Sequence, residues 1–243
     1  MHELAKYNCK IILSSRNEIA LKKVATTSKL LPENNFILPI DLEQNKDSDI
    51  WVSKIIERFK RVDIVINNGG FSQRSYAIDT NNSIERKLME VDYFSYTAIT
   101  KSLLPIFHKQ GGGKIVVISS IAGKFGFYSR TTYSAAKHAL HGYFDSLRLE
   151  EENNGISVLI VCPGKIQTNI SNNAVLGDGS KHSIVDPSHK NAVSSDACAQ
   201  QILNAIKRNK QEIYIGGKEL LMVYFKQFLP ALFRYLVRRV KRD

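Results

Sequence analysis

Three residues in the middle of the chain have the types and the spacing of a proton-transfer site. Ser120, Tyr133 and Lys137 follow the pattern Ser-x12-Tyr-x3-Lys. Positions four apart on a helix share one face, so Tyr133 and Lys137 can point into the same cleft. A phenol has a pKa of about 10 and is a poor base near neutrality, but a neighbouring ammonium stabilises the phenolate. Tyr133 can therefore act as an acid or a base, while Ser120 holds a substrate oxygen by a hydrogen bond.

Short apolar runs alternate with helical patterns and determine where these residues lie. The runs predict strands at residues 9–16, 35–41, 62–70, 111–120, 156–164 and 212–217. The segments between them predict helices at residues 18–31, 49–59, 83–90, 94–108, 131–153 and 195–209. Apolar strands separated by helices indicate an α/β fold with a parallel sheet covered on both faces. Ligands bind beyond the carboxyl ends of such strands, where Ser120, Asn67 and Pro163 lie.

Length and composition favour a single domain without a metal. The 243 residues contain no linker, repeat or low-complexity tract. Cys9, Cys162 and Cys198 are widely spaced and form no CxxC or Cys/His pattern, which predicts free thiols in a reducing compartment and no metal site. The N-terminal residues lack the apolar core of a signal peptide, which predicts a cytoplasmic location. The net charge is +11, and six of the 34 Lys and Arg residues lie in residues 226–243.

Two further turns extend the pattern, and with them the chain resembles the short-chain dehydrogenase/reductase family. Residues 67–70 read NNGG and resemble the family's NNAG turn after the fourth strand, with Gly70 in place of alanine. Pro163 and Gly164, followed by Thr168, resemble its PG turn near the nicotinamide.

The resemblance extends from residue 9 to about residue 216 and implies a Rossmann-type, doubly wound parallel sheet. We expect this domain to cover residues 1–216. A basic, amphipathic helical extension would follow it over residues 217–243.

The resemblance also implies roles for the matching residues. Tyr133 would be the acid/base, and Ser120 would orient the carbonyl or alcohol oxygen. Lys137 would stabilise the phenolate and bind the nicotinamide ribose, and Thr168 would hold the carboxamide. The implied reaction is hydride transfer between NADPH and a carbonyl carbon, coupled to protonation of its oxygen.

Cofactor binding is implied for a larger set of positions. They are Arg16, Asp41, Leu42, Asn67, Gly69, Tyr133, Lys137, Pro163, Gly164 and Thr168. Asp41 and Leu42 match the pair that contacts adenine in the family. Arg16 stands where NADP-preferring members place a base for the ribose 2′-phosphate, which favours NADP over NAD. The alternative for Arg16 is a solvated charge at a strand end.

One departure from the family pattern concerns the catalytic set. The family places an asparagine on the helix after the fourth strand, where it supports a water relay to the lysine, and this chain has Asp92. A carboxylate can pair with Lys137 and keep it protonated. We therefore expect an altered proton relay rather than an abolished one.

A larger departure is that the chain contains no TGxxxGxG, the loop with which the family cradles the pyrophosphate. Glycines 111–113 precede a strand and do not replace it. The resemblance therefore suggests a chain shortened at its N-terminus by one β-α unit, a hypothesis that the upstream DNA would test. Loss of that unit would leave the neighbouring strands without ladder partners.

The segments that we expect to determine the substrate and the cellular location give fewer clues than the catalytic residues. Residues 165–193 occupy the place of the family's substrate-covering segment, and the alternative is an ordinary surface loop. Phe125, Phe127 and Tyr128 could form an apolar wall for a lipid-like substrate, although core packing explains them equally well. Residues 219–242 combine helical apolar spacing, a kink at Pro230 and terminal cations, which predicts peripheral membrane contact or a helix packed on the domain or in a dimer interface.

The sequence thus predicts an NADP-dependent oxidoreductase that interconverts a carbonyl and an alcohol. A homo-oligomer paired through residues 94–108 and 131–153 is implied by the resemblance alone. The competing interpretation is a non-catalytic product that acts in interactions or at a membrane. Nucleic-acid binding is not expected, because no reading module accompanies the cations.

Overall fold

A computed structural model describes residues 1–184 and 192–239 of the chain. Its strands are β1 (Ile11–Leu13), β2 (Asn35–Ile37), β3 (Ile64–Asn67), β4 (Gly113–Ile118), β5 (Ile156–Pro163), β6 (Ile166–Gln167), β7 (Val193–Ser194) and β8 (Glu212–Ile215). Its α-helices are α1 (Glu18–Thr27), α2 (Ser48–Phe59), α3 (Asn82–Met89), α4 (Ser95–Gln110), α5 (Thr131–Glu150), α6 (Ser195–Lys207), α7 (Leu221–Phe228) and α8 (Pro230–Val237). Each strand and helix expected between residues 9 and 217 is present, with ends shifted by a few residues.

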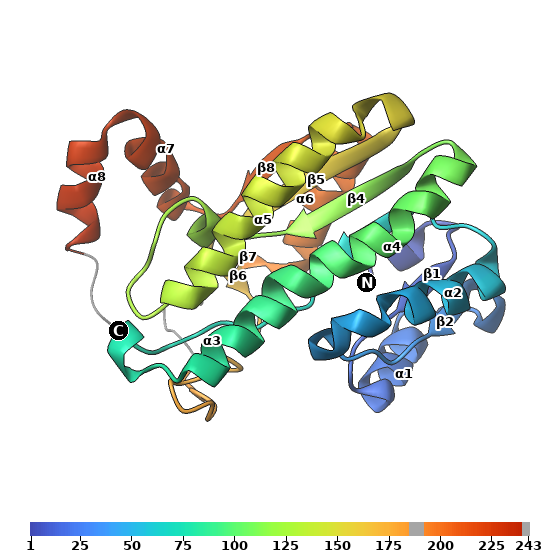
Figure 1. Ribbon diagram of the computed structural model, residues 1–243, viewed down its shortest axis with the longest axis horizontal. Coiled ribbons are helices and arrows are strands. Elements are labelled where there is room, and N and C mark those ends of the chain that lie inside the picture. Colours follow the sequence, from blue (N-terminus) through green and yellow to red (C-terminus); the bar gives the residue numbers. More distant parts are fainter. Residues whose placement is uncertain (185–191, 240–243) are drawn as a thin grey trace.

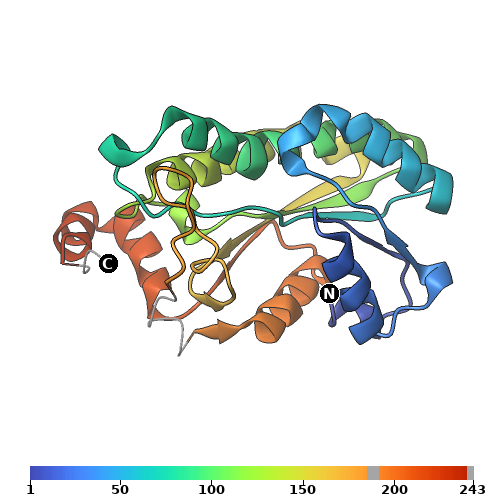
Figure 2. The ribbon, with the colours of Figure 1, turned by 90° about the horizontal axis from the view of Figure 1, so that it is seen from below.

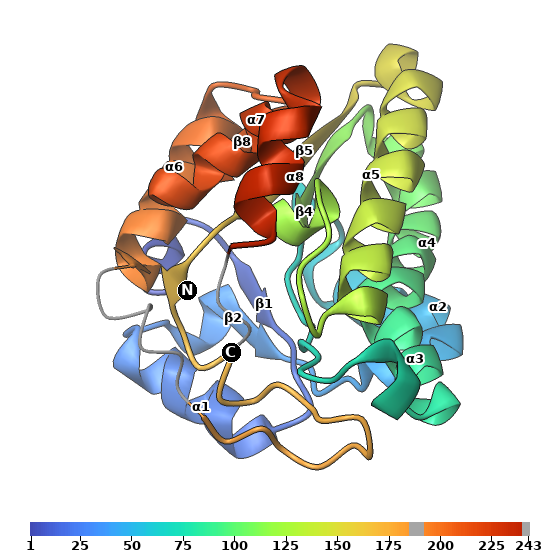
Figure 3. The same ribbon diagram turned by 90° about the vertical axis from the view of Figure 1, so that its left-hand side faces the viewer.

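The central sheet is parallel and has the strand order β3-β4-β5-β8. Helices α2, α4 and α5 cover one face, and α1 and α6 lie on the other side, so the molecule has three layers (Figures 1, 2 and 3). The carboxyl ends of β4 and β5 point toward the end of the molecule that carries α7 and α8 (Figure 1). The predicted doubly wound α/β fold is confirmed.

Strands β4 and β5 form the centre of the core because they are apolar on both faces. Ile115 and Val117 pack with α4 and α5, whereas Val116 packs with α6 on the opposite face. The side chains of β5 alternate in the same way between the two clusters. This two-sided burial explains the continuous apolar runs that identified both strands in the sequence.

Strands β1 and β2 pair with each other in a separate parallel ladder. No pairing joins β1 to β3 within the described residues, so β3 is an edge strand of the central sheet. Ile64 and Ile66 on β3 are 42% and 36% exposed, unlike the apolar residues of β4 and β5. One side of β3 is therefore an unpaired edge within the described residues.

The connection between α3 and α4 was not anticipated. We expected two helices with a break between them, but Glu90–Phe94 form a π-helical turn that joins α3 to α4 without interruption. The amide of Ser95 donates to the carbonyl of Glu90, five residues earlier. Such turns insert one extra residue into a helix and often occur at functional sites.

The C-terminal segment folds back onto the end of the domain. Pro230 is the first residue of α8, and Leu229 breaks the helix, as the expected kink required. Val223 of α7 and Phe233 of α8 pack with Phe125, whose side chain is buried. Of the segments expected to determine substrate and location, residues 185–191 and 240–243 lie outside the described residues. The described helices include none that is both long enough and apolar enough to cross a bilayer.

Candidate active site

Ser120 lies directly after β4 and begins a short 3-10 turn, Ile121–Gly123. Its hydroxyl oxygen accepts the amide of Ala122 at 3.1 Å, and its hydroxyl donates to the carbonyl of Pro163 at 3.4 Å. The strand end, the turn and the start of the PG segment therefore fix the position of this side chain. The serine is only half-buried, so the hydroxyl remains accessible to a ligand.

Tyr133 and Lys137 lie one turn apart on α5, and both side chains are buried. The ammonium of Lys137 lies over the Tyr133 ring, 5.7 Å from its centroid. Tyr133 packs with Ala122, which is two residues beyond Ser120. The structure thus brings the predicted serine, tyrosine and lysine into one region, although they come from different elements.

Lys137 is held by groups from three other elements. Its ammonium donates to the carbonyl of Ile118 at 3.2 Å and lies 3.2 Å from the Oδ2 atom of Asp92. It also lies over the Tyr96 ring at 5.4 Å. Only 4% of the Lys137 residue is exposed, so this charge has protein rather than water around it.

Asp92 lies in the π-helical turn and is fully buried. Its Oδ1 atom accepts the amide of Phe71 at 3.0 Å, which ties it to the segment after β3. A Cβ atom at Gly70 would lie 2.9 Å from both carboxylate oxygens. A Cβ atom at position 70 would therefore crowd the Asp92 side chain in its present position, so the two departures from the family pattern, Gly70 and Asp92, are in direct contact.

The charges in this cluster influence one another. Burial raises the pKa of Asp92, and the Lys137 ammonium limits that rise. Burial alone would lower the pKa of Lys137, but the negative charge that Tyr96, Asp92 and Tyr133 can carry outweighs burial and raises it. Lys137 is therefore held in its protonated form, as we expected from an aspartate at position 92.

The two residues expected near adenine, Asp41 and Leu42, lie at the start of a short 3-10 turn. Leu42 reaches Gly69, where a Cβ atom would meet its Cδ1 atom at 2.5 Å. Asp41 caps the following turn by accepting the amide of Glu43 at 3.1 Å, so its carboxylate already has a structural role. Asn67 is buried and donates to Thr100 at 3.3 Å. Arg16 is exposed in the connection between β1 and α1.

The PG segment also lies at a strand end, as predicted. The amide of Gly164 donates to the carbonyl of Ile215 at 2.8 Å, which places the segment beside the end of β8. The carboxylate of Glu219 accepts the amides of Lys165 and Gly217, so it organises this segment from the C-terminal side. Thr168 is exposed.

These residues fit one half of a nicotinamide dinucleotide better than the other. The Tyr133 phenol and the Lys137 ammonium are adjacent donors suited to a ribose. The chain has no TGxxxGxG loop, the backbone cradle that the family uses for the pyrophosphate. The described residues therefore support the nicotinamide half, and the phosphate half has no glycine cradle of that pattern.

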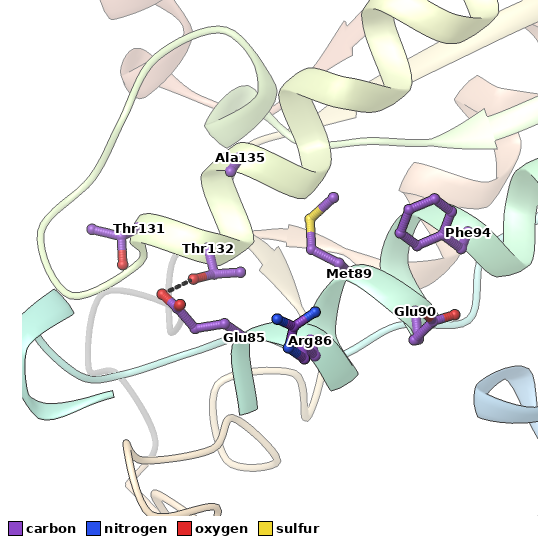
Figure 4. A pocket seen from close by; sticks show the side chains of 8 residues that line it. All are labelled: Glu85, Arg86, Met89, Glu90, Phe94, Thr131, Thr132 and Ala135. Carbon is purple, nitrogen blue, oxygen red and sulfur yellow. Dashed lines mark hydrogen bonds between the residues drawn. The ribbon is translucent and has the colours of Figure 1, made fainter. Parts of the chain in front are cut away.

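An open hollow with a volume of about 530 Å³ lies beside α3 and the start of α5. Its walls come from α3, the π-helical turn and the first turn of α5 (Figure 4). Thr132 donates to Glu85 at 2.8 Å across it. Neither Ser120 nor Tyr133 lines this hollow, so it is separate from the predicted chemistry.

Sequence reasoning missed Tyr96, the residue that completes the cluster. Its hydroxyl donates to the carbonyl of Gly69 at 3.0 Å, and its ring lies against the Lys137 ammonium. Burial raises its pKa, so the hydroxyl stays neutral. Asp92 lies in the π-helical turn and Tyr96 lies just after it, and both face Lys137. The turn left no recognisable signal in the sequence.

Comparisons with known proteins agree with this geometry. The short chain dehydrogenase family pattern matches residues 1–178. "Dehydrogenase/reductase SDR family protein 7-like" of Drosophila melanogaster is 35% identical over 243 residues, covering 98% of this chain and 74% of the relative. "Dehydrogenase/reductase SDR family member 7B" of Mus musculus is 35% identical over 240 residues, covering 96% of this chain and 74% of the relative.

A crystal structure of a short chain dehydrogenase/reductase from Burkholderia phymatum in complex with NAD has the same fold. Its TM-score is 0.82 at 18% identity, covering 95% of this chain and 88% of that one. A short-chain dehydrogenase from Streptomyces avermitilis gives a TM-score of 0.78 at 24% identity, with the same coverage. The family pattern and the relatives, together with the serine, tyrosine and lysine found in one region, show that the chain belongs to the NAD(P)-dependent short-chain dehydrogenase/reductase family.

Proposed function

We propose that this protein interconverts a carbonyl compound and an alcohol with NADP as its cofactor. The observation that carries the proposal is the arrangement on α5, where the ammonium of Lys137 lies over the ring of Tyr133 and is charged because of Asp92. When bound, the nicotinamide supplies or accepts the hydride. The chain itself must then move one proton to or from the substrate oxygen.

Tyr133 is the group proposed for that proton transfer. In the reductive direction its O–H bond breaks as the substrate oxygen gains the proton, and the phenolate that remains is stabilised by the Lys137 ammonium. Ser120 donates to the same substrate oxygen and fixes its orientation, exchanging its weak bond to the carbonyl of Pro163. Asp92 and Tyr96 touch Lys137 rather than the substrate and act as positioning residues.

The preference for NADP is proposed from Arg16. Its guanidinium is exposed after β1, where it can meet a ribose 2′-phosphate by two parallel hydrogen bonds. Asp41 and Leu42 would lie on the adenine side. The substrate is proposed to be a small carbonyl or alcohol compound.

A calorimetric titration of the reduced chain with NADPH, and separately with NADH, tests this proposal. We expect saturable binding that favours NADPH, and Arg16→Ser should weaken NADPH binding about tenfold while leaving NADH unchanged. Lys10→Ser is the matched control, since Lys10 is also an exposed cation at the start of β1. A folded chain that binds neither cofactor would favour the non-catalytic alternative, which the missing TGxxxGxG loop supports.

We also propose peripheral contact with an anionic membrane through α7 and α8. These helices and the break between them expose six large apolar residues: Leu221, Tyr224, Phe228, Leu229, Leu232 and Tyr235. Cations at Lys226, Arg234 and Arg238 are exposed on the same segment. An apolar surface flanked by cations suits the interface of an anionic bilayer.

Co-sedimentation with vesicles tests the membrane proposal. We expect binding to vesicles that contain phosphatidylserine, with little binding to phosphatidylcholine alone. Phe228→Ser should weaken binding, and Ile19→Ser, an equally exposed apolar residue on α1, should not. Equal binding by both variants would contradict the assignment to α7 and α8.

Pairing of two chains through α4 and α5 is a further proposal. The hollow in Figure 4 and the 45% exposed ring of Phe94 lie on that side of the molecule. Light scattering on the purified chain should give the mass of a dimer, and Phe94→Glu should give that of a monomer. A wild-type chain that stays monomeric would contradict the proposal.

A further inference from the structure

A second cluster of reactive side chains lies between α5 and the strands β5 and β8. His141 comes from α5, Cys162 from β5 and Glu212 from the start of β8. One ligand atom from each residue lies within 4.8 Å of the other two. Cys162 is fully buried, His141 is 8% exposed, and the Glu212 side chain is 33% exposed. The proposed catalytic reaction uses none of these three residues.

Two distances within the cluster match those between ligands of one small divalent cation. The Cys162 sulfur lies 3.4 Å from the Oε1 atom of Glu212, and the Nδ1 atom of His141 lies 3.6 Å from the same oxygen. Zinc binds sulfur at about 2.3 Å and nitrogen or oxygen at about 2.0–2.2 Å, so tetrahedral ligand atoms are about 3.3–3.6 Å apart. The sulfur lies nearest to the other ring nitrogen of His141, Nε2, at 3.7 Å, so the imidazole or the thiol must shift for sulfur and Nδ1 to bind one ion.

The hydrogen bonds around His141 leave one ring nitrogen available. Ser119 donates its hydroxyl to the carbonyl of Lys137 at 3.2 Å, so its oxygen is free to accept the Nε2 proton of His141 at 3.1 Å. This network assigns the proton to Nε2 and leaves a lone pair on Nδ1. Nδ1 is buried and has no hydrogen-bond partner among the described residues.

Two acceptors then face each other without a proton between them. The Nδ1 lone pair and the Glu212 carboxylate are 3.6 Å apart, which is too long for a hydrogen bond. A cation between them would satisfy both groups. The bond from Nε2 to Ser119 is the kind of outer contact that orients a metal-binding histidine.

We propose that His141, Cys162 and Glu212 form a binding site for Zn²⁺, with the fourth position open to water. Nitrogen, sulfur and carboxylate ligands are the set that zinc takes in proteins. On binding, the Cys162 S–H bond breaks, a sulfur–zinc bond forms and the proton goes to the buffer. The exposed side of Glu212 gives the ion a route in.

Charged and titratable neighbours limit the affinity of this site. The Lys124 ammonium lies 2.5 Å from the Oε1 atom of Glu212 and must turn away when an ion binds. Burial, with Lys124 adding to it, lowers the pKa of His141 to about 4, so the imidazole is neutral and able to bind a metal. The other groups facing the cluster are Asp145, His138 and Tyr214.

A zinc titration of the reduced, chelator-treated chain against a competing chromogenic chelator tests the site. We expect one zinc per chain, and Co²⁺ in its place should give the charge-transfer absorption of a thiolate ligand. Cys162→Ser and His141→Gln should each weaken binding at least about 100-fold. The matched controls are Cys198→Ser and His138→Gln, which should bind zinc like the wild type.

A variant at Lys124 should change the zinc affinity in the opposite direction. Lys124→Gln should tighten zinc binding severalfold, because it removes a cation from the Glu212 carboxylate. Binding that is equally strong in Cys162→Ser, or absent from the folded wild-type chain, would overturn the proposal.

A test on the wild-type chain does not depend on how the variants fold. Cys162 is fully buried, so a thiol-alkylating reagent reacts with it slowly; zinc should slow this reaction further and leave the reaction of Cys9 unchanged, as read by mass spectrometry. Zinc at a hundred times its dissociation constant should also raise the melting temperature by roughly 5–10 °C. Equal protection of both cysteines would contradict a site at Cys162.

Discussion

The part of the molecule proposed to move the proton and the part proposed to hold the adenosine are built differently. Strands β4 and β5 lie between two clusters of buried side chains, and the apolar residues Ile115, Val116 and Val117 are completely buried. Strands β1 and β2 have three residues each, and one small cluster around Ile11 supports them. The groups that need accurate placement are therefore fixed by the better-packed region.

The charges of the two regions follow the same division. Lys137 and Asp92 are buried and paired, so their geometry is determined by the surrounding core. Arg16 lies exposed on the surface after β1. The groups proposed for the chemistry are thus pre-organised by the core, whereas the residue proposed for cofactor preference lies on an exposed segment.

Removing the proton donor should have the largest effect. Tyr133→Phe should lower turnover by about 10²–10⁴, because the substrate oxygen loses its proton source. NADPH affinity and the free energy of unfolding should change little, since the ring and its packing remain. Steady-state kinetics, calorimetry and urea denaturation measure the three quantities. Tyr143→Phe, on the same helix, is the control, and an equal loss of turnover there would point to a structural effect instead.

A matched pair of leucines tests the difference in packing directly. Leu140→Ala, in the main core, should cost about 4–5 kcal/mol of unfolding free energy, whereas Leu21→Ala, in the cluster near Ile11, should cost about 2–3 kcal/mol. Leu140 is fully buried and has less room to relax than Leu21. Urea denaturation of both variants provides the numbers. Equal costs would mean that the two regions are packed equally well.

Asp92→Asn should have the smallest effect of the three. The carboxylate helps to raise the pKa of Lys137, so its removal lets the lysine lose its proton at a lower pH. The alkaline limb of kcat/KM should move down by roughly one pH unit, with a severalfold change in turnover. The control is Glu90→Gln in the same turn, which binds Asn45 instead. A profile identical to that of the wild type would show that Asp92 does not tune the lysine.

Much of the fold followed from local patterns in the sequence. The apolar runs of β4 and β5 and the four-residue spacing of Tyr133 and Lys137 are properties of consecutive residues, and these expectations were met within a few residues. The pairing of Asp92 with Lys137 was anticipated through the resemblance to the family. In each of these cases the deciding interaction lies within one element or one known motif.

The features that escaped prediction depend on distant contacts. Tyr96 lies over Lys137 from a helix that follows the π-helical turn, and the hydrogen bonds of that turn have no signature in residue types. The proximity of His141, Cys162 and Glu212 arises only after α5, β5 and β8 have packed together. Spacing along the chain cannot show a cluster to which three separate elements contribute.

The π-helical turn also makes the site sensitive to the length of the chain. A π turn contains one residue more than an α-helical turn, and each residue of an α-helix corresponds to a rotation of about 100°. Deleting Val91 would restore regular α-helical hydrogen bonding and rotate α3 against α4 by that angle. Asp92 and Tyr96 could then face Lys137 only if α3 lost its own contacts. A deletion of one codon here would thus do more harm to the site than most substitutions.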